Sequence, residues 1–383
     1  MSSWSSPDSG TVTPGTVTVA RLWLTDFRAV ETLDLTLSGG LTVFVGANAQ
    51  GKTTLLEAVA WVARARSFRG VPDAALVRAG QEQSVLRAEV RHDEREQLFE
   101  AEIRATGRNR VQLNHTAIAR TRDLHGLLRV SVFAPDDLQL VKGGPAHRRD
   151  YLDELLSALA RRYDAAAADF ERVLRQRNAL LRRGLRHVTD RATLEVFDDQ
   201  LVAAASEVVR GRMKLLDRLA PTIERAYQIL GGPAVEIGAN YRAEWSSDPV
   251  DESAATIEEL LVSALATARD RELERGVTLV GPHRDELQLR INGLDARTHA
   301  SQGEQRTLAL ALRLAGHEVV AGITGTRPVL LLDDVFSELD PARAEALVAS
   351  LPACQTLLTT AGAIPASVRP DRTLRVDRAQ VLE

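Results

Sequence analysis

The sequence predicts an α/β protein in which a mixed β-sheet core carries a glycine-rich loop, an antiparallel β layer lies beside that core, and a helical lobe forms a short antiparallel helical arm. Three observations support this prediction. A strand, the loop and a helix follow one another over residues 41–66. A second apolar strand, Val329–Asp333, ends in two carboxylates. Between them, residues 148–230 carry apolar side chains at helical spacing.

The glycine-rich loop fits the G-x4-G-K-[ST] pattern of a phosphate-binding loop. It follows the strand Leu41–Val45, and its residues are Gly46, Ala47, Asn48, Ala49, Gln50, Gly51, Lys52, Thr53 and Thr54. The glycines let backbone N–H groups surround an anion, and the helix that follows directs its unpaired donors at it. Lys52 supplies a catalytic positive charge to the β- and γ-phosphates, and the Thr53 hydroxyl is a ligand for Mg²⁺. The loop therefore predicts a bound nucleotide.

Composition and charge are those of an ordinary globular chain. With 383 residues, 44% of them hydrophobic, it is long enough for two or three domains. No run approaches the ~18 consecutive apolar residues of a membrane span. Residues 1–16 are polar and rich in Gly, Pro and Ser, so we expect a disordered tail, and they lack the pattern of a signal peptide. The single Cys354 excludes an internal disulfide and fits a reducing cytoplasm. The net charge of −4 excludes a globally basic nucleic-acid binder.

The first part of the chain alternates between apolar and polar residues, as strands do. We expect an edge strand at Val17–Leu24 and a second strand at Glu31–Leu37, ahead of the strand that leads into the loop. Three half-polar strands of the antiparallel layer and one apolar strand of the core are expected at 84–91, 97–105, 108–113 and 130–134.

The middle of the chain changes to helical patterning. Helices are expected at 148–183 and 192–219, with a break at Gly184, and a further helix is expected from Pro221 to Leu230. Two adjacent helices of about 30 residues would form an antiparallel arm roughly 45 Å long. A strand at 236–242 and a helix at 256–275 follow.

The last part of the chain returns to the patterns of the core. We expect a strand at Gly276–Val280, a hairpin between residues 287 and 297 that turns at Asn292-Gly293, and a last core strand at Thr356–Thr360. The predicted organisation is a tail at 1–16, a discontinuous head at 17–145 and 270–383, and a helical lobe at 146–269.

The strand Val329–Asp333 and the residue after it have the pattern of a Walker B element. A strand buried on both faces delivers one carboxylate to the Mg²⁺ shell, which we assign to Asp333. Asp334 is then placed to orient or deprotonate the attacking water as a catalytic group. An acidic pair in a solvated turn is the other interpretation of these two residues.

Ser301 to Arg306 precede a leucine-rich helix. Ser301 and Glu304 are most simply a capping box at its start. Their position about 30 residues before the Walker B strand, far downstream of a phosphate-binding loop, also matches the signature motif of ABC-type ATPases. Ser301, Gln302 and Gly303 are therefore candidates for a nucleotide contact.

In these motifs and their order the chain resembles the RecF family, recombination mediators of bacteria within the SMC/ABC-type ATPases. The resemblance covers essentially the whole chain after the tail, and the blocks at 132–156 and 278–287 are specific to this family. The matching blocks are LTDFRAVETLDL (24–35), VGANAQGKTTLLEAV (45–59), ARSFRG (65–70), VFAPDDLQLVKGGPAHRRDYLDELL (132–156), LRQRNALLR (174–182), TLVGPHRDEL (278–287), SQGEQRTLALALRLA (301–315) and LLLDDVFSELDPAR (330–343).

The resemblance implies an ABC/SMC-type P-loop ATPase head without a long coiled coil. It implies that ATP and Mg²⁺ join two copies of the chain into a homodimer, in which Ser301, Gln302 and Gly303 of one copy close over the nucleotide of the other. It also implies slow ATP hydrolysis used as a switch and binding to gapped DNA at single-strand/double-strand junctions. With RecO and RecR, such a protein helps to load RecA in DNA repair and replication restart in the cytoplasm.

Three positions depart from the pattern of related ATPases. Glu304 stands where ABC transporters have Gln, as in the SMC branch, so its carboxylate must turn away from the γ-phosphate. No His follows the strand expected at Thr356–Thr360. Pro135–Asp137 stand where relatives place a metal-sensing Gln.

Two arginine clusters are candidates for contacts with DNA phosphates. Residues 171–191 contain seven arginines, Arg177 among them, against only Glu171 and Asp190. Residues 104–129 contain six arginines against only Asp123. Few aromatic residues lie between them, which favours backbone contacts over base stacking. Solvated helix faces and pairs within one helix are the other interpretation. The arginines that we assign to DNA are Arg172, Arg175, Arg182, Arg183, Arg186, Arg108 and Arg110.

Three other functions stay open at this point. A small-molecule P-loop kinase accounts for the loop but not for Ser301–Gln305 or the helical arm. The ATPase subunit of a transporter, or of another assembly without DNA, accounts for all three motifs but should carry a switch His and needs a membrane partner. A clamp that binds ATP with negligible hydrolysis is harder to separate, because Asp334 need not be a fast base.

Overall fold

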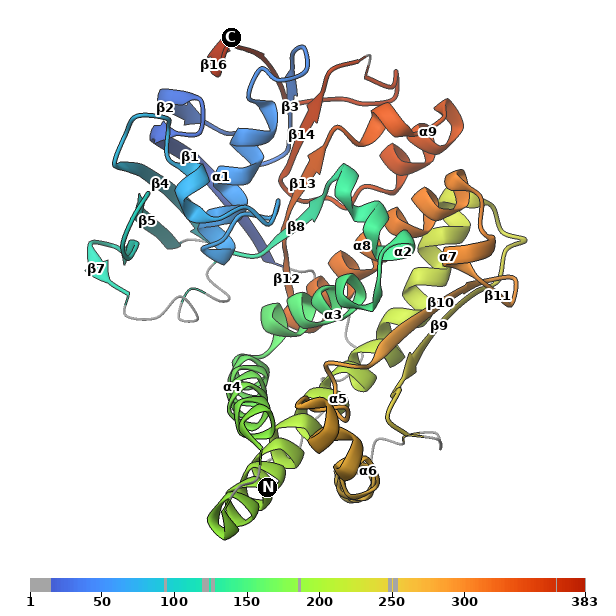
Figure 1. Ribbon diagram of the computed structural model, residues 1–383. Helices are drawn as coiled ribbons and strands as arrows, with labels where there is room; N and C mark the ends of the chain where they lie inside the picture. The colour runs from blue at the N-terminus through green and yellow to red at the C-terminus, as the bar shows by residue number, and fades with distance from the viewer. Residues whose placement is uncertain are drawn as a thin grey trace.

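The computed structural model describes residues 15–92, 95–118, 124, 128–184, 187–246, 250, 254–362 and 364–382. Figure 1 shows a head in which two sheets lie on either side of α1, and a lobe of α4, α5 and α6 that extends away from it. Of the predicted tail, residues 1–14 lie outside the described residues. Gly15 and Thr16 do not belong to a tail, because they begin the first strand and pair with Thr326 and Arg327.

The strands are β1 (Gly15–Phe27), β2 (Val30–Thr36), β3 (Leu41–Val45), β4 (Gln83–His92), β5 (Arg95–Arg104), β6 (Arg110–Leu113), β7 (Thr116–Ala117), β8 (Val130–Phe133), β9 (Ile237–Arg242), β10 (Glu286–Ile291), β11 (Leu294–Asp295), β12 (Thr326–Arg327), β13 (Val329–Asp333), β14 (Thr356–Thr360), β15 (Arg372–Asp377) and β16 (Gln380–Leu382). The helices are α1 (Lys52–Arg64), α2 (Gln139–Lys142), α3 (Pro145–Leu159), α4 (Arg161–Arg183), α5 (Val188–Gly231), α6 (Ala254–Arg275), α7 (Ala296–His299), α8 (Gln302–Thr324) and α9 (Pro341–Ser350). Short 3-10 turns are η1 (Asp73–Leu76), η3 (Pro135–Leu138) and η4 (Val335–Glu338).

The core sheet has the order β16-β15-β3-β14-β13-β8, and all neighbours except β15 and β16 run parallel. Both of its faces are covered, which is why β13 is buried along its whole length. Leu331 packs in the cluster that contains α1, whereas Leu330 and Leu332 pack with Leu347 of α9 on the other face.

A second sheet, with the order β12-β1-β4-β5-β6-β7, forms the antiparallel layer. The prediction of an edge strand at Val17–Leu24 is wrong. β1 pairs with β4 along one side, and with β2 and β12 along the other. Alternation of apolar residues shows which face of a strand is buried, but it carries no information about how many neighbours the strand has.

Helix α1 lies between the two sheets. Eleven of its 13 residues are buried, because β1 and β4 cover one side and β8, β13 and β14 the other. Trp61 is fully buried and meets the ring of Phe99 on β5 edge-on, with 6.4 Å between centroids. The helix that starts at the glycine-rich loop is therefore held rigidly against both layers.

The helices of the lobe differ in their limits from the prediction. The run 148–183 is two helices, because Ala160 has an extended backbone (φ −148°, ψ 112°) between α3 and α4. The run 192–230 is part of one helix of 44 residues, α5, with Pro221 inside it. α5 packs against α4, α6 and α8 over its length, and such tertiary contacts can outweigh the hydrogen bond that a proline removes. The arm therefore consists of α4 and the first part of α5, with α6 beside them.

Two predictions for residues 276–297 have opposite outcomes. Gly276–Val280 is not a strand but a turn and irregular backbone. The hairpin at Asn292-Gly293 is confirmed, since both residues have positive φ (50° and 78°), as a type I′ turn requires. β10 of this hairpin also pairs with β9, so a small sheet crosses the predicted boundary between lobe and head.

Helix α8 is the one helix in the described part of the chain that is long and apolar enough to cross a membrane. In its most apolar window, 61% of the residues are buried inside the protein. Leu308, Leu312 and Ala315 are fully buried within the largest core cluster, together with residues of α3 and α5. α8 is thus a central core helix that joins head and lobe.

Candidate nucleotide-binding site

The carboxyl edge of the parallel sheet brings two distant motifs together. β3 ends at Val45, before the glycine-rich loop, and β13 ends at Asp333. β14 lies between them, with Thr359 in register with Phe44 on one side and with Asp333 on the other. Because parallel strands end at the same edge, Thr53 Oγ1 donates to Asp333 Oδ1 at 2.8 Å across 280 positions of sequence.

Lys52 begins α1, and its side chain folds back over the loop. Its Nζ donates to the carbonyl oxygens of Gly46 and Ala47 at 2.7 Å each, and only 6% of the residue is exposed. Burial lowers the pKa of Lys52, an effect that the nearby carboxylates of Asp334 and Asp333 partly offset. An ammonium group held by neutral carbonyls can exchange them for phosphate oxygens, which suits the predicted role.

Asp333 is surrounded by hydroxyl groups. Thr359 Oγ1 donates to its Oδ1 at 2.7 Å, and Thr53 Oγ1 contacts both carboxylate oxygens. Burial raises the pKa of Asp333, against the effect of these hydrogen bonds. Carboxylate and hydroxyl oxygens are the ligands that Mg²⁺ prefers, and a cation would favour the charged carboxylate.

This oxygen cluster fits a metal that is shared with a nucleotide. Within the described ranges, no group of three or more His, Cys, Asp or Glu side chains is placed to hold a metal ion. Mg²⁺ in such sites typically takes one or two carboxylates and completes its shell with phosphates and water. Thr53 and Asp333 therefore suit an ion that arrives with a triphosphate.

Asp334 adopts a left-handed backbone conformation (φ 49°, ψ 34°). Its N–H donates to Thr359, to the carbonyl at 3.1 Å and to Oγ1 at 3.0 Å, and its carboxylate accepts from the N–H of Ala361 at 3.4 Å. This conformation costs a non-glycine residue roughly 1–2 kcal/mol. The turn aims two successive carboxylates differently, Asp333 at Thr53 and Asp334 at the loop that follows β14.

The C-terminal hairpin β15–β16 packs on the glycine-rich loop, a contact that the sequence reasoning missed. Gln50 accepts from Arg378 N through its side chain at 2.7 Å and from Ala379 N through its carbonyl at 2.9 Å. A Cβ on Gly46 would lie 2.3 Å from the carbonyl oxygen of Val376, so only glycine fits there. The alternation in Arg372–Asp377 signals a strand, but the turn at Arg378-Ala379 has no glycine or asparagine to mark it.

Ser301 caps α8 as the capping box predicts. Its Oγ accepts from Glu304 N at 3.3 Å, and Glu304 Oε2 accepts from Ser301 N at 2.8 Å. Hydrogen bonds from Ser301 lower the pKa of Glu304, whose carboxylate is turned back to the cap. Ser301 and Gln302 are exposed, and Gly303 lies beside the guanidinium of Arg343. Among the described residues, no hydrogen bond or ion pair joins 301–303 to the loop 46–54.

The segment at the position of the metal-sensing Gln carries a carboxylate that is already engaged. Asp137 Oδ1 accepts from Arg313 at 2.6 and 3.0 Å, and its Oδ2 accepts from Ala134 N at 2.8 Å. A small cavity of about 50 Å³ separates Asp137 from Asp333 and Asp334. Asp137 therefore faces the Walker B residues while it is paired with α8.

Arg177 does not belong to a DNA-binding cluster, because it is fully buried. Its guanidinium donates to Asp198 at 2.8 Å, to Glu272 at 2.6 Å and to Thr278 Oγ1 at 2.9 Å. These partners lie on α5, on α6 and in the irregular segment after α6. Arg177 holds the lobe together, and helical spacing alone could not distinguish it from its exposed neighbours.

The other candidate arginines lie on two separate parts of the molecule. On α4 and at its end, Arg172, Arg175 and Arg183 are exposed and pair with Asp169, Glu171 and Asp190 at 3.1, 3.4 and 2.7 Å. Arg182 is also exposed, and Arg186 lies outside the described residues. Arg108 and Arg110 are exposed at the β5–β6 end of the antiparallel layer, which Figure 1 shows apart from α4.

Comparison with known proteins agrees with this architecture. The RecF/RecN/SMC N-terminal domain matches residues 18–363. The DNA replication and repair protein RecF of Frankia alni is 44% identical over 363 residues, which cover 93% of this chain and 96% of that protein. RecF of Streptomyces avermitilis is 43% identical over 350 residues, 90% of this chain and 93% of its own length.

Solved structures show the same fold. The recombination mediator protein RecF-ATP in the RecFOR pathway superposes with a TM-score of 0.89 at 29% identity and covers 97% of this chain and 99% of its own. The Smc head domain of Pyrococcus furiosus, bound to the C-terminal domain of ScpA, gives a TM-score of 0.55 at 15% identity over 94% of each chain, a likeness of fold alone. The predicted ABC/SMC-type head is confirmed.

Proposed function

This chain belongs to the RecF family, and on that premise we propose that it is an ATP-dependent, DNA-binding recombination mediator. ATP joins two copies of the chain, and the pair holds gapped duplex DNA at a single-strand/double-strand junction. There it cooperates with RecO and RecR to load RecA in DNA repair and replication restart in the cytoplasm. The observation that carries the proposal is the meeting of Lys52, Thr53 and Asp333 at one sheet edge, in a chain similar to a recombination mediator solved with ATP.

The nucleotide site supports ATP binding with Mg²⁺. In the bound state, Lys52 exchanges the carbonyls of Gly46 and Ala47 for the β- and γ-phosphates, and the backbone N–H groups of the loop surround the same oxygens. Thr53 and Asp333 would hold Mg²⁺, which would neutralise charge on the phosphates. The hairpin contact with Gln50 keeps the loop in shape.

The position of Ser301 supports a homodimer. Ser301 and Gln302 are exposed and, in the described part of the chain, form no hydrogen bond or ion pair with the loop of their own copy, so we assign their nucleotide contact to a second copy. A γ-phosphate held between the loop of one copy and Ser301–Gly303 of the other stabilises the pair until hydrolysis removes it. The ligand then has different affinities for the open and closed states, which is what a switch requires.

Asp334 is proposed as the group that orients or deprotonates water for slow hydrolysis. Asp334→Asn keeps the size of the side chain but removes the base, so we expect turnover to fall by about 100-fold and the ATP-bound dimer to persist longer. Steady-state ATPase and dimer dissociation measure the two effects. An unchanged ATPase rate would remove Asp334 from this role.

Ser301→Arg tests the dimer. The longer, charged side chain blocks the approach of the second copy but leaves the loop of its own chain intact. We expect ATP binding as in the wild type and no dimer with a non-hydrolysable analogue, measured by sizing with light scattering. Ser263→Arg, at an exposed serine of α6, is the matched control and should dimerise. Dimers of Ser301→Arg would show the proposed arrangement to be wrong.

A further inference from the structure

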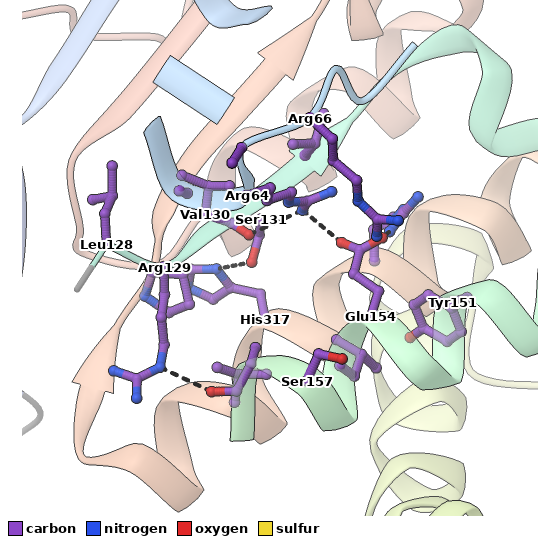
Figure 2. Close-up of a pocket in the computed structure, with 18 residues that line it drawn as sticks. Arg64, Arg66, Leu128, Arg129, Val130, Ser131, Tyr151, Glu154, Ser157 and His317 are labelled. Atoms are coloured by element: carbon purple, nitrogen blue, oxygen red, sulfur yellow. Dashed lines mark hydrogen bonds and ion pairs between the residues drawn. The ribbon is translucent and has the colours of Figure 1, made fainter. Parts of the chain in front are cut away.

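A second cavity, of about 440 Å³, lies between the end of α1, the start of β8, α3 and α8. Figure 2 shows its wall, with the side chains of Arg66 and Glu154 toward one end, that of Arg129 toward the other, and those of Arg64, Ser131 and His317 between them. The volume falls in the range of small-molecule sites, about 300–1,000 Å³. Leu155 and Val320 give it an apolar face. It is separate from the nucleotide site, because none of its lining residues belongs to the loop 46–54 or to β13.

The lining carries an excess of positive charge, with four arginines and one glutamate. Arg64 and Arg313 share Glu154, at 2.5 and 3.4 Å. Burial opposes the ionisation of Glu154, but the charges of Arg64, Arg313 and Arg66 outweigh it, so its pKa lies below the ordinary value. Arg313 also pairs with Asp137 at 2.6 Å. Arg64, Glu154, Arg313 and Asp137 thus form a network of ion pairs with no net charge.

Arg66 and Arg129 form no ion pair within 4 Å of a carboxylate among the described residues, although the charge of Arg66 also acts on Glu154. Arg66 is exposed at the cavity. Arg129 is partly buried, and its Nε donates to the carbonyl of Ala158 at 3.1 Å, which fixes the guanidinium without neutralising it. A partly buried cation held by a neutral group is costly unless an anion joins it. The cavity is thus lined by two positive groups that can interact with an anionic ligand.

Neutral polar groups add to these cations. His317 is 3% exposed, its Nδ1 lies 3.0 Å from Ser131 Oγ, and its Nε2 is buried with no hydrogen-bond partner in the described part of the chain. Ser157 also lines the cavity. Unsatisfied buried polar atoms are rare in native proteins and often mark a missing ligand or water. The hydroxyls and the imidazole can complete the hydrogen bonds of an anion that the arginines attract.

We propose that this cavity binds a phosphomonoester, whose negative charge is attracted by Arg66 and Arg129 and whose organic body lies against Leu155 and Val320. Guanidinium groups suit phosphate because their planar forks match its oxygens. Arg64 stands in the last turn of α1, the helix that Lys52 begins, while His317 stands on α8, the helix that Ser301 caps. A bound ligand therefore contacts both α1 and α8, the two helices that begin at the proposed nucleotide contacts. This link to the nucleotide rests on the proposed function, whereas binding of the ligand to the cavity does not.

The test is a titration of the full chain by calorimetry at low salt. The nucleotide site is first saturated with a non-hydrolysable ATP analogue and Mg²⁺, and the probes are ribose 5-phosphate, inorganic phosphate and ribose. We expect one saturable site for ribose 5-phosphate, weaker binding of inorganic phosphate because the organic body contributes, and no binding of ribose. Phosphate that binds as tightly as ribose 5-phosphate would overturn the assignment of a phosphomonoester.

Single substitutions test whether ribose 5-phosphate binds in this cavity. Arg66→Gln and Arg129→Gln should each weaken ribose 5-phosphate binding by about 10-fold or more, while Arg290→Gln, at an exposed arginine of β10, should not. No saturable binding to the wild type, or equal binding to all variants, would overturn the proposal. Repeating the titration with Lys52→Ala separates it from the proposed function, because loss of ATP binding should leave this second site intact.

Discussion

The carboxyl edge of the parallel sheet and the helical lobe both hold charged side chains away from solvent, but they satisfy those charges differently. At the sheet edge, Lys52 bonds to neutral carbonyls and Asp333 to neutral hydroxyls. In the lobe and where α3 and β10 adjoin it, buried arginines bond to carboxylates. Arg148 holds Glu286 through two hydrogen bonds of 2.7 and 2.8 Å, and Arg212 holds Asp153 through two of 2.8 Å.

The kind of partner distinguishes charges that are free to bind a ligand from charges that stabilise the fold. A charge with neutral partners can exchange them for a phosphate or a metal at little cost. A charge that is already neutralised inside the protein cannot leave its partner without exposing another buried charge. Arg177, with Asp198 and Glu272, is of the second kind, and the exposed arginines of α4 are a third kind, paired loosely in solvent.

The largest expected effect on ligand binding concerns ATP. Lys52→Ala removes the charge that is to meet the phosphates, and we expect the affinity for ATP to fall by about 100-fold or more, ~3 kcal/mol, with the fold intact because its present partners are neutral. Calorimetry with ATP and Mg²⁺ measures the change, and Lys214→Ala, an exposed lysine of α5, is the control. If Lys52→Ala bound ATP as tightly as the wild type, neutral hydrogen-bond partners would not mark a charge that binds a ligand.

The next effect is on stability. Arg177→Met keeps much of the volume but leaves Glu272, which is fully buried, without its cation. We expect the free energy of unfolding to fall by about 3–5 kcal/mol, measured by chemical denaturation, whereas Arg175→Met on the same helix should change it by less than about 0.5 kcal/mol. Adding Glu272→Gln to Arg177→Met should restore part of the loss. If it does not, the charge of Glu272 is not the cause.

A pH dependence is expected from another buried carboxyl group, that of Asp285 directly before β10. Burial raises the pKa of Asp285 to about 7, against hydrogen bonds from Tyr241 and other groups. The folded state then binds a proton that the unfolded state has released, so this group stabilises the fold at pH 4 and that contribution is lost as the pH rises to 7. Over this range the contribution of Asp285 to the free energy of unfolding falls by up to about 1.4 kcal/mol per pH unit.

The comparison of wild type with Asp285→Asn isolates this effect. Burial lowers the pKa of His283 and of His317 to about 4, which acts in the opposite direction over the same range. The prediction therefore concerns the difference in unfolding free energy between the two proteins. As the pH rises from 5 to 7, the wild type should lose stability relative to Asp285→Asn. A difference that does not vary with pH would show that Asp285 is ionised throughout.

The smallest effect per residue is expected on DNA. Replacing Arg172, Arg175 and Arg182 together by Ala should weaken binding to gapped duplex about equally for all sequences, and lower the slope of log K against log salt by about 1 for each DNA phosphate that the variant no longer binds. Fluorescence anisotropy over a salt series measures both quantities. Arg290→Ala is the control, and an unchanged slope in the triple variant would remove α4 from the DNA-binding surface.

The sequence by itself determined the features that depend on neighbouring residues. The glycine-rich loop, the acidic end of β13, the cap at Ser301 and the turn at Asn292-Gly293 each lie within a few residues, and their side chains and backbone preferences specify them locally. These motifs were enough to predict the head fold, and they include the residues Thr53 and Asp333 that meet at the sheet edge.

The tertiary structure decided how distant segments pair. Nothing near Pro221 shows that α5 continues through it, because the packing against α4, α6 and α8 is what holds that helix together. Nothing near Gln50 shows that the turn at Arg378 rests on it, some 328 positions away. Arg177 and Arg175 have the same local charge pattern, yet one is buried and the other exposed. A residue's type sets its charge, but whether that charge is met by solvent, by a carboxylate or by a ligand depends on which parts of the chain surround it.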